Sequence, residues 1–322
     1  MSPLDHPSLS SDEAVATIAD RAAGLGDEHT ASASLAAGPR AALILREIHA
    51  ADLARHPAAL QSLFDGETDG LLVRGLFDPA LMARVAQRID EGRVPRRIMG
   101  DQAGLPEVPF TVGQAIVGVA DELDDYFADA ALQSERIRQL FAEEADFEAQ
   151  IAEALSTLGG GLPVQRAHGP AGEPCPTATI RVLPEGAEIG VHVDNSFLHM
   201  PRARHLHRLV DTRGQLSYFV PLSVPEAGGE LMVYTLQWAA AKLFMPDVAQ
   251  ASANVWLEGS EVHDLVTRFE HGVFAPGVGD LLIFDGGRHF HRVSKVVGPT
   301  LRRTIGGFLG LAPAHDALYV WS

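Results

Sequence analysis

The sequence predicts a mainly β protein with supporting helices, and two observations lead to this prediction. Residues 179–183 and 190–193 are rich in β-branched side chains and are separated by the turn-forming Pro-Glu-Gly at 184–186. Residues 281–284 form a short apolar run between turns that contain Gly and Asp, and residues 304–309 have the same character. We therefore expect these stretches to form strands of one β-core.

The N-terminal half contains two further strands and three predicted helices. Residues 42–45 and 70–74 have the apolar composition of strands. Large apolar residues recur at every fourth position in 79–91, which predicts an amphipathic helix. Residues 121–145 and 147–158 are also predicted helices. These helices would cover one face of the β-core.

Length and composition indicate one large domain. The chain has 322 residues, of which 46% are hydrophobic and 21% charged, so it can bury a sizeable core. Residues 1–40 are rich in Ala, Ser, Gly and Asp and poor in large apolar residues, which predicts a flexible N-terminal extension. We expect residues 41–322 to form one folded domain.

The composition also argues against several classes of partner. A net charge of -17 offers no basic surface for a nucleic acid. No apolar run is long enough to span a membrane. The single cysteine, Cys175, excludes intrachain disulfides and fits a reducing compartment, and the N-terminus lacks the features of a signal peptide. These features predict a cytoplasmic location.

The spacing of His192, Asp194 and His291 predicts a metal site. In a β-strand the side chains at i and i+2 point to the same face, so His192 and Asp194 can reach one ion. Two imidazoles and one carboxylate form the facial triad, which binds non-haem Fe(II) and leaves positions open for a cosubstrate and dioxygen. The interval between residues 192 and 291 suits a double-stranded β-helix, that is, a jelly-roll or cupin-like core flanked by helices. His289, two residues earlier on the same strand face, is the alternative to His291.

Two arginines follow the distal histidine on the next predicted strand. Arg302 or Arg303 could form a bidentate ion pair with a dicarboxylate bound to the metal.

Several segments, in this order along residues 43–322, make a resemblance recognisable. The chain resembles the Fe(II)/2-oxoglutarate-dependent oxygenases, and within them the carrier-protein-independent halogenases that act on hapalindole-type indole alkaloids. The segments that carry the resemblance are Thr177-Ala178-Thr179-Ile180-Arg181, Val191-His192-Val193-Asp194-Asn195, Gln215-Leu216-Ser217-Tyr218-Phe219, Val224-Pro225-Glu226-Ala227-Gly228-Gly229-Glu230-Leu231, Gly286-Gly287-Arg288, His291-Arg292-Val293-Ser294 and Arg302-Arg303-Thr304-Ile305-Gly306-Gly307-Phe308.

One departure from those halogenases bears on the chemistry. Their metal motif has a Gly at the middle ligand position, where chloride binds the iron, and this sequence has Asp194. The resemblance therefore implies Fe(II), 2-oxoglutarate and O2 with the outcome of a hydroxylase. Such an enzyme would hydroxylate an unactivated C–H bond of a hydrophobic small molecule of the natural-product type and release succinate and CO2. No carrier protein is expected.

The resemblance also implies roles for further residues. Arg302 with Thr304 matches the pattern that holds the distal carboxylate of 2-oxoglutarate, with Arg303 as the alternative if a bulge shifts the register. Ser217 matches a pocket serine of the halogenases, although a serine in a strand is often only part of the sheet. The residues expected to line the substrate pocket are Ile189, Ala115, Ile116 and Asn195. The polar stretch 199–208 is expected to form a lid over the substrate.

Three other functions stay open at this point. The chain could be a halogenase-like or a desaturating oxygenase that acts on an alkaloid. It could also be a non-catalytic jelly-roll module that binds a metal or senses 2-oxoglutarate. A closed structural metal site normally has four protein ligands, which argues against that last alternative.

Overall fold

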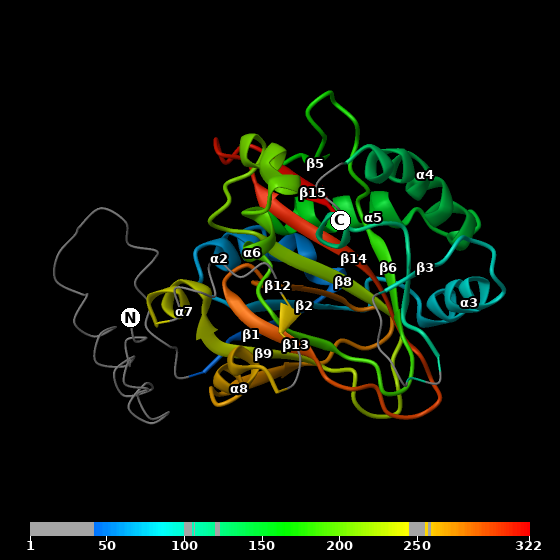
Figure 1. Cartoon of the computed structure of the whole chain (residues 1–322). Helices are drawn as coiled ribbons and strands as arrows, with labels where there is room; N and C mark the ends of the chain where they lie inside the picture. Colours follow the sequence, from blue (N-terminus) through cyan, green and yellow to red (C-terminus); the bar gives the residue numbers. More distant parts are fainter. Residues whose placement is uncertain (1–41, 100–104, 106, 120–122, 245–254, 257–258) are drawn as a thin grey trace.

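A computed structural model describes residues 42–99, 105, 107–119, 123–244, 255–256 and 259–322 (Figure 1). Two β-sheets form the core, and helices cover the larger sheet. The predicted extension at residues 1–40 lies outside the described residues. Among the described residues, no helix combines the length and the apolar character that a membrane crossing requires.

The larger sheet has ten strands, and the order along its main path is β1-β2-β12-β8-β14-β6-β4-β3. Strand β15 pairs with β14 and with β5. The β1–β2 and β15–β5 pairs are parallel and the others are antiparallel. In sequence order the strands are β1 (Leu45–His49), β2 (Gly70–Arg74), β3 (Arg97–Ile98), β4 (Phe110–Val112), β5 (Val164–Arg166), β6 (Thr179–Leu183), β8 (Leu216–Ser223), β12 (Leu281–Phe284), β14 (Arg302–Leu311) and β15 (Leu318–Trp321).

The smaller sheet has five antiparallel strands in the order β10-β7-β13-β9-β11. Their bounds are β7 (Ile189–His192), β9 (Leu231–Gln237), β10 (Val255–Trp256), β11 (His271–Phe274) and β13 (His289–Val293). Together the two sheets give the predicted jelly-roll core with flanking helices.

Aspartate side chains cap the start of two helices. Asp78 accepts a hydrogen bond from the backbone N–H of Ala80 at the start of α3, and Asp146 accepts one from Ala149 at the start of α5. The helices are α2 (Ala59–Phe64), α3 (Pro79–Asp90), α4 (Asp124–Phe141), α5 (Phe147–Leu158), α6 (Asn195–Leu198), α7 (Trp238–Phe244) and α8 (Glu261–Val266), with 3-10 turns η1 (Ala50–Arg55), η2 (Ile116–Gly118) and η3 (Pro201–Arg208).

The main hydrophobic core lies between the larger sheet and helices α3, α4 and α5, which gather on one side of it (Figure 1). Alternate residues of β8 and β14, such as Val220 and Ile305, face this core. The intervening residues face the smaller sheet. This alternation separates a structural face of the larger sheet from the face that lines a cavity.

Most predicted elements are confirmed, with small differences at their ends. The structure has strands or helices at 70–74, 147–158, 179–183 and 281–284, with the predicted bounds. The prediction for residues 42–45 was wrong in its limits, because the parallel pairing with β2 begins only at Leu45 and continues to His49. Residues 121–122 of the predicted helix 121–145 lie outside the described residues, and α4 ends at Phe141.

The packing predicts which strand residues determine stability. Ile283 in β12 is fully buried, whereas Val273 in β11 is 52% exposed. We expect Ile283→Ala to lower the free energy of unfolding by about 2–5 kcal/mol because it leaves a cavity in the core. The matched change Val273→Ala should alter it by less than about 0.5 kcal/mol. Denaturant unfolding of both variants checks this, and similar losses in the two would contradict the assignment of the core.

Candidate metal centre

A cavity of about 280 Å³ lies between the two sheets. Strands β6, β8 and β14 of the larger sheet contribute to its wall, as do β7 and β13 of the smaller sheet. Residues 115, 117 and 118, next to or within the η2 turn, close part of one side. Side chains from distant parts of the sequence thus meet around one cavity.

Three buried ligand-type residues meet at one point of this wall. His192 and His291 are paired across β7 and β13, and their ring centroids are 4.1 Å apart. Asp194 lies two residues beyond the end of β7, at the N-cap of α6, so it does not share a strand with His192 as the spacing predicted. Its Oδ1 is 3.9 Å from Nε2 of His192, and its Oδ2 is 3.6 Å from Nε2 of His291. All three side chains can offer one ligand atom to a single ion.

In both histidines, Nδ1 of the ring is hydrogen-bonded to a backbone carbonyl oxygen. Nδ1 of His192 lies 2.8 Å from the carbonyl oxygen of Gly190, and Nδ1 of His291 lies 3.0 Å from that of His289. A carbonyl can only accept, so Nδ1 donates and Nε2 keeps its lone pair for a metal. Burial lowers the pKa of His192 to about 3 and the pKa of His291 to about 4. Both imidazoles are therefore neutral at pH 7, as metal ligation requires.

The Asp194 carboxylate is the third donor, and open space lies beside it. Burial raises the pKa of Asp194, and this effect is opposed by His192, by a hydrogen bond from Ser217 and by the charge of Arg181. Two neutral imidazoles and one carboxylate sit on one side of a cavity, which leaves room for further ligands on the other. This donor set fits a facial iron site and differs from the closed set of a structural zinc site.

His289, the alternative third ligand, has a different environment. The pairing of β13 with β9 shifts register between His289 and His291. The His289 ring is fully buried, with Nδ1 2.9 Å from the Tyr234 carbonyl oxygen and Nε2 3.1 Å from Oδ1 of Asp69. Both of its nitrogens are engaged, so the structure brings His291, and not His289, to the cluster.

Two arginines and a threonine face the cavity from the larger sheet. Arg302 is buried, donates through Nε to the Gly229 carbonyl oxygen at 2.7 Å and lies 5.5 Å from the Phe219 ring centroid. Burial lowers the pKa of Arg302 to about 9, so it remains a cation at pH 7. Thr304 pairs across the strands with Arg181, and both line the cavity.

Arg181 is a candidate that the sequence analysis did not single out. It lies two residues after Thr179 on β6, so both side chains point to the same face and line the cavity. Among the described residues its Nε has no hydrogen-bond partner. Asp194 is the sole acidic residue among the described residues of the wall. The side chains of the wall thus provide two cations and one anion, which suits a bound dianion.

Arg303, the alternative to Arg302, points to the opposite face of β14. Both of its contacts with the Asp90 carboxylate oxygens are 2.7 Å long, and they tie the strand to the end of α3. The alternation of side chains along a strand explains this: residues 302 and 304 share the cavity face, and residue 303 lies on the other.

The other predicted pocket residues divide into two groups. Ser217, Ile189 and Ala115 line the cavity, and Ser217 also donates a hydrogen bond to Oδ2 of Asp194. Ile116 does not line it, because the η2 turn directs this side chain into a separate buried cluster. Asn195 lies outside the strand, at the start of α6, and lines a different cavity.

The predicted lid is also placed differently. Residues 201–208 form η3, and none of residues 199–208 lines the cavity. Ala203 and Leu206 are buried in a cluster with Phe308 and Trp321, which fixes this stretch against the fold. It therefore packs as a supporting element beside the site.

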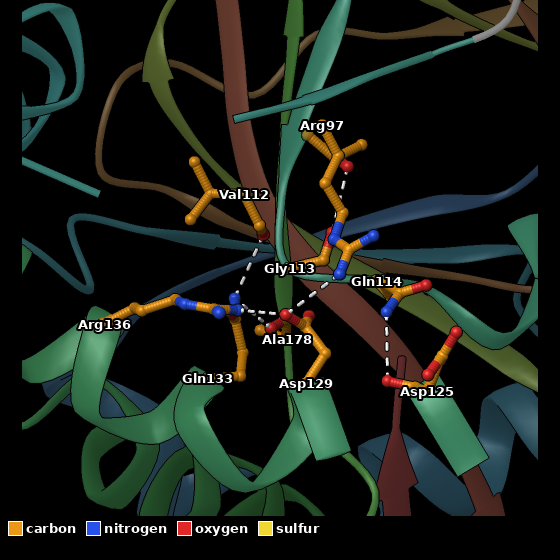
Figure 2. A network of polar contacts seen from close by, with 10 residues as sticks. Arg97, Val112, Gly113, Gln114, Asp125, Asp129, Gln133, Arg136 and Ala178 are labelled. Carbon is orange, nitrogen blue, oxygen red and sulfur yellow. Dashed lines mark hydrogen bonds and ion pairs between the residues drawn. The ribbon is translucent and has the colours of Figure 1, made fainter. Parts of the chain in front are cut away.

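A polar network on α4 holds the segment that carries Ala115 (Figure 2). Nε2 of Gln133 donates to the carbonyl oxygens of Val112 and Ala178 at 3.0 and 3.1 Å. Gly113 has a φ of +85°, and a Cβ there would lie 2.5 Å from Gln133. Only glycine fits this close approach without strain, and the approach fixes the start of the wall segment.

Comparison with known proteins bears on this site. The sequence matches the family described as carrier-protein-independent halogenase WelO5 over residues 43–322. A search of curated proteins gave no match. The fold is similar to that of an N-substituted L-amino acid dioxygenase from Burkholderia ambifaria AMMD, with a TM-score of 0.52 and 16% identity over 83% of this chain and 91% of that one. A 2OG-Fe(II) oxygenase family oxidoreductase from Burkholderia pseudomallei gives a TM-score of 0.42 and 14% identity over 86% and 97% of the respective chains.

The family match covers every element that the structure describes. The triad of His192, Asp194 and His291 supplies the ligand set of a non-haem iron centre. The chain is accordingly an enzyme of the iron- and 2-oxoglutarate-dependent oxygenases, and it belongs to the family of carrier-protein-independent halogenases represented by WelO5.

Proposed function

We propose that this enzyme is a hydroxylase, which uses 2-oxoglutarate and dioxygen to hydroxylate an unactivated C–H bond of a small apolar molecule. One observation carries the proposal: the Asp194 carboxylate lies between the two histidines, at the position that the resemblance assigns to glycine and chloride in halogenases. A carboxylate there occupies the coordination position that a halide would need. Succinate and CO2 are the coproducts.

The ligand-type and cationic residues of the cavity then have distinct roles. His192, Asp194 and His291 would hold Fe(II). Arg302 would pair with the distal carboxylate of 2-oxoglutarate, with Thr304 beside it on the same strand face. Arg181, whose charge lowers the pKa of Asp194, would balance the remaining negative charge of the cosubstrate. The site, once it held iron, cosubstrate and dioxygen, would have the oxidant that C–H hydroxylation needs.

The rest of the wall supports an apolar substrate. No acidic side chain other than Asp194 faces the cavity from the described residues. An apolar molecule would displace water from the side chains that it contacts. Those that form the apolar part of the wall include Met99, Ala115, Val117, Ile189, Val255, Val293 and Phe308. A small molecule held in this way needs no carrier protein to present it.

Halogenation is the second candidate, because the matched family is named for it. Product mass distinguishes the two reactions. With Fe(II), 2-oxoglutarate, dioxygen and chloride, we expect the enzyme to add one oxygen atom to an accepted apolar substrate and to form succinate. The Asp194→Gly variant should bind halide at the vacated position, since a chloride ion can take the place of the carboxylate. A chlorinated product from the unaltered enzyme would contradict the assignment as a hydroxylase.

Replacing the two neighbouring histidines of β13 tests the ligand set. His291→Ala removes a ligand, so we expect loss of Fe(II) binding and of succinate formation. His289→Ala leaves the metal site intact but removes the imidazole that contacts Oδ1 of Asp69 in the core, which should cost about 1–3 kcal/mol of stability. Metal titration and denaturant unfolding of both variants separate these effects. Metal binding that survives in His291→Ala and disappears in His289→Ala would reverse the assignment.

The arginine pair of β14 tests the cosubstrate site. Arg302→Ala removes a buried, charge-assisted contact, so the affinity for 2-oxoglutarate should fall by about 2–5 kcal/mol. Arg303→Ala is the matched control, because its partner is Asp90 on the other face of the sheet. The concentration of 2-oxoglutarate that gives half-maximal succinate formation measures both. If this concentration rose steeply in Arg303→Ala and not in Arg302→Ala, Arg303 would be the residue that binds 2-oxoglutarate, and the assignment of Arg302 would be wrong.

A further inference from the structure

The Asp194 carboxylate is restrained by a residue from the opposite sheet. Asp194 follows β7 of the smaller sheet, and Ser217 lies near the start of β8 in the larger one. The Ser217 hydroxyl donates a hydrogen bond to Oδ2 of Asp194, and both residues are buried. Among the described side chains, Ser217 is the one that donates a hydrogen bond to this carboxylate.

The position of Ser217 is itself fixed by the sheet. Ser217 pairs with Phe284 of β12 on one side and with Phe308 of β14 on the other. A residue between two paired strands has little freedom to move, because its backbone is bonded on both edges. The fixed backbone therefore keeps the hydroxyl within hydrogen-bonding reach of the carboxylate.

Gly286 lies directly next to the same carboxylate. Its carbonyl oxygen accepts a hydrogen bond from the backbone N–H of Asp194 at 2.8 Å. A Cβ on this residue would lie 2.3 Å from Oδ2 of Asp194 and 2.6 Å from Oγ of Ser217. Such contacts are too short for any side chain to occupy, so the glycine leaves the space that the carboxylate and hydroxyl share.

We propose that Ser217 is a positioning residue for the metal: it fixes the rotation of the Asp194 carboxylate, and Gly286 provides the space for this contact. The inference rests on the proposed function, in which Asp194 binds iron. A carboxylate that turns freely about its Cβ–Cγ bond must be ordered when the ion binds. A hydrogen bond already made in the free protein removes that cost, as partners of metal ligands generally do.

Metal affinity in the absence of cosubstrate tests the proposal, with Co(II) as a probe that is stable in air. Calorimetric titration gives the affinity, and the visible absorption of bound Co(II) reports on its coordination. We expect Ser217→Ala to lower the affinity by roughly 10- to 100-fold and to alter the absorption band. Ser223→Ala is the matched control, because this serine lies on the same strand and its hydroxyl donates to the Leu301 carbonyl oxygen. It should bind Co(II) like the unaltered protein.

A double-mutant cycle shows whether Ser217 acts through Asp194. In the Asp194→Gly background the hydroxyl has no carboxylate to hold, so adding Ser217→Ala should leave the remaining affinity for Co(II) unchanged. An equal loss in both backgrounds would overturn the proposal, as would an unchanged affinity of Ser217→Ala in the otherwise unaltered protein.

The same titrations separate this inference from the proposed function. If the unaltered protein binds Co(II) and Ser217→Ala binds it equally well, the metal site stands and the role of Ser217 is refuted. If the unaltered protein binds no Co(II), the proposed metal centre itself fails, and the inference fails with it. Thermal unfolding without metal provides the check that Ser217→Ala is folded.

Discussion

The cross-strand pairing of His192 with His291 is the constraint on which the rest of the site depends. The two residues lie far apart in the sequence, and the β7–β13 pair sets their rings 4.1 Å apart. The same backbone holds each Nδ1, so both Nε2 atoms face the position next to Asp194. Burial keeps both imidazoles neutral at pH 7, so the sheet holds them in the protonation state that metal binding requires. Loss of this register would separate the three donors.

The larger sheet supplies the charge that complements this ligand set. Strand alternation turns Arg302 and Thr304 toward the cavity and Arg303 toward α3, so one β-strand serves both the cosubstrate site and the core. Arg181 adds a second cation across from Thr304. Buried cations are costly unless they are paired. A dianionic cosubstrate bound next to iron would satisfy both arginines, which links the fold of the sheet to the chemistry proposed for it.

Local patterns in the sequence were enough to single out the three ligand-type residues and to predict most of the strands, which follow the two-residue period of a β-strand. The reason given for Asp194 was wrong, because β7 ends at His192 and Asp194 lies beyond it, at the N-cap of α6. They could not decide between Arg302 and Arg303, since a bulge would have exchanged the two faces. Ile116 was expected in the pocket, but a single 3-10 turn directs it into another cluster. Arg181 was missed because an arginine within a strand gives no local sign of facing a cavity. The residues that sequence patterns leave uncertain are those whose direction is set by tertiary contacts.

The central claim is that the Asp194 carboxylate occupies the coordination position that a halide would take in a halogenase. The most direct measurement is the visible charge-transfer band of the enzyme with Fe(II) and 2-oxoglutarate, recorded without oxygen and with increasing chloride. If Asp194 is a ligand, the band should form without chloride and keep its position and intensity as chloride is added. A band that requires chloride, or shifts with it in a saturable way, would show that the position is open to halide and would contradict the account.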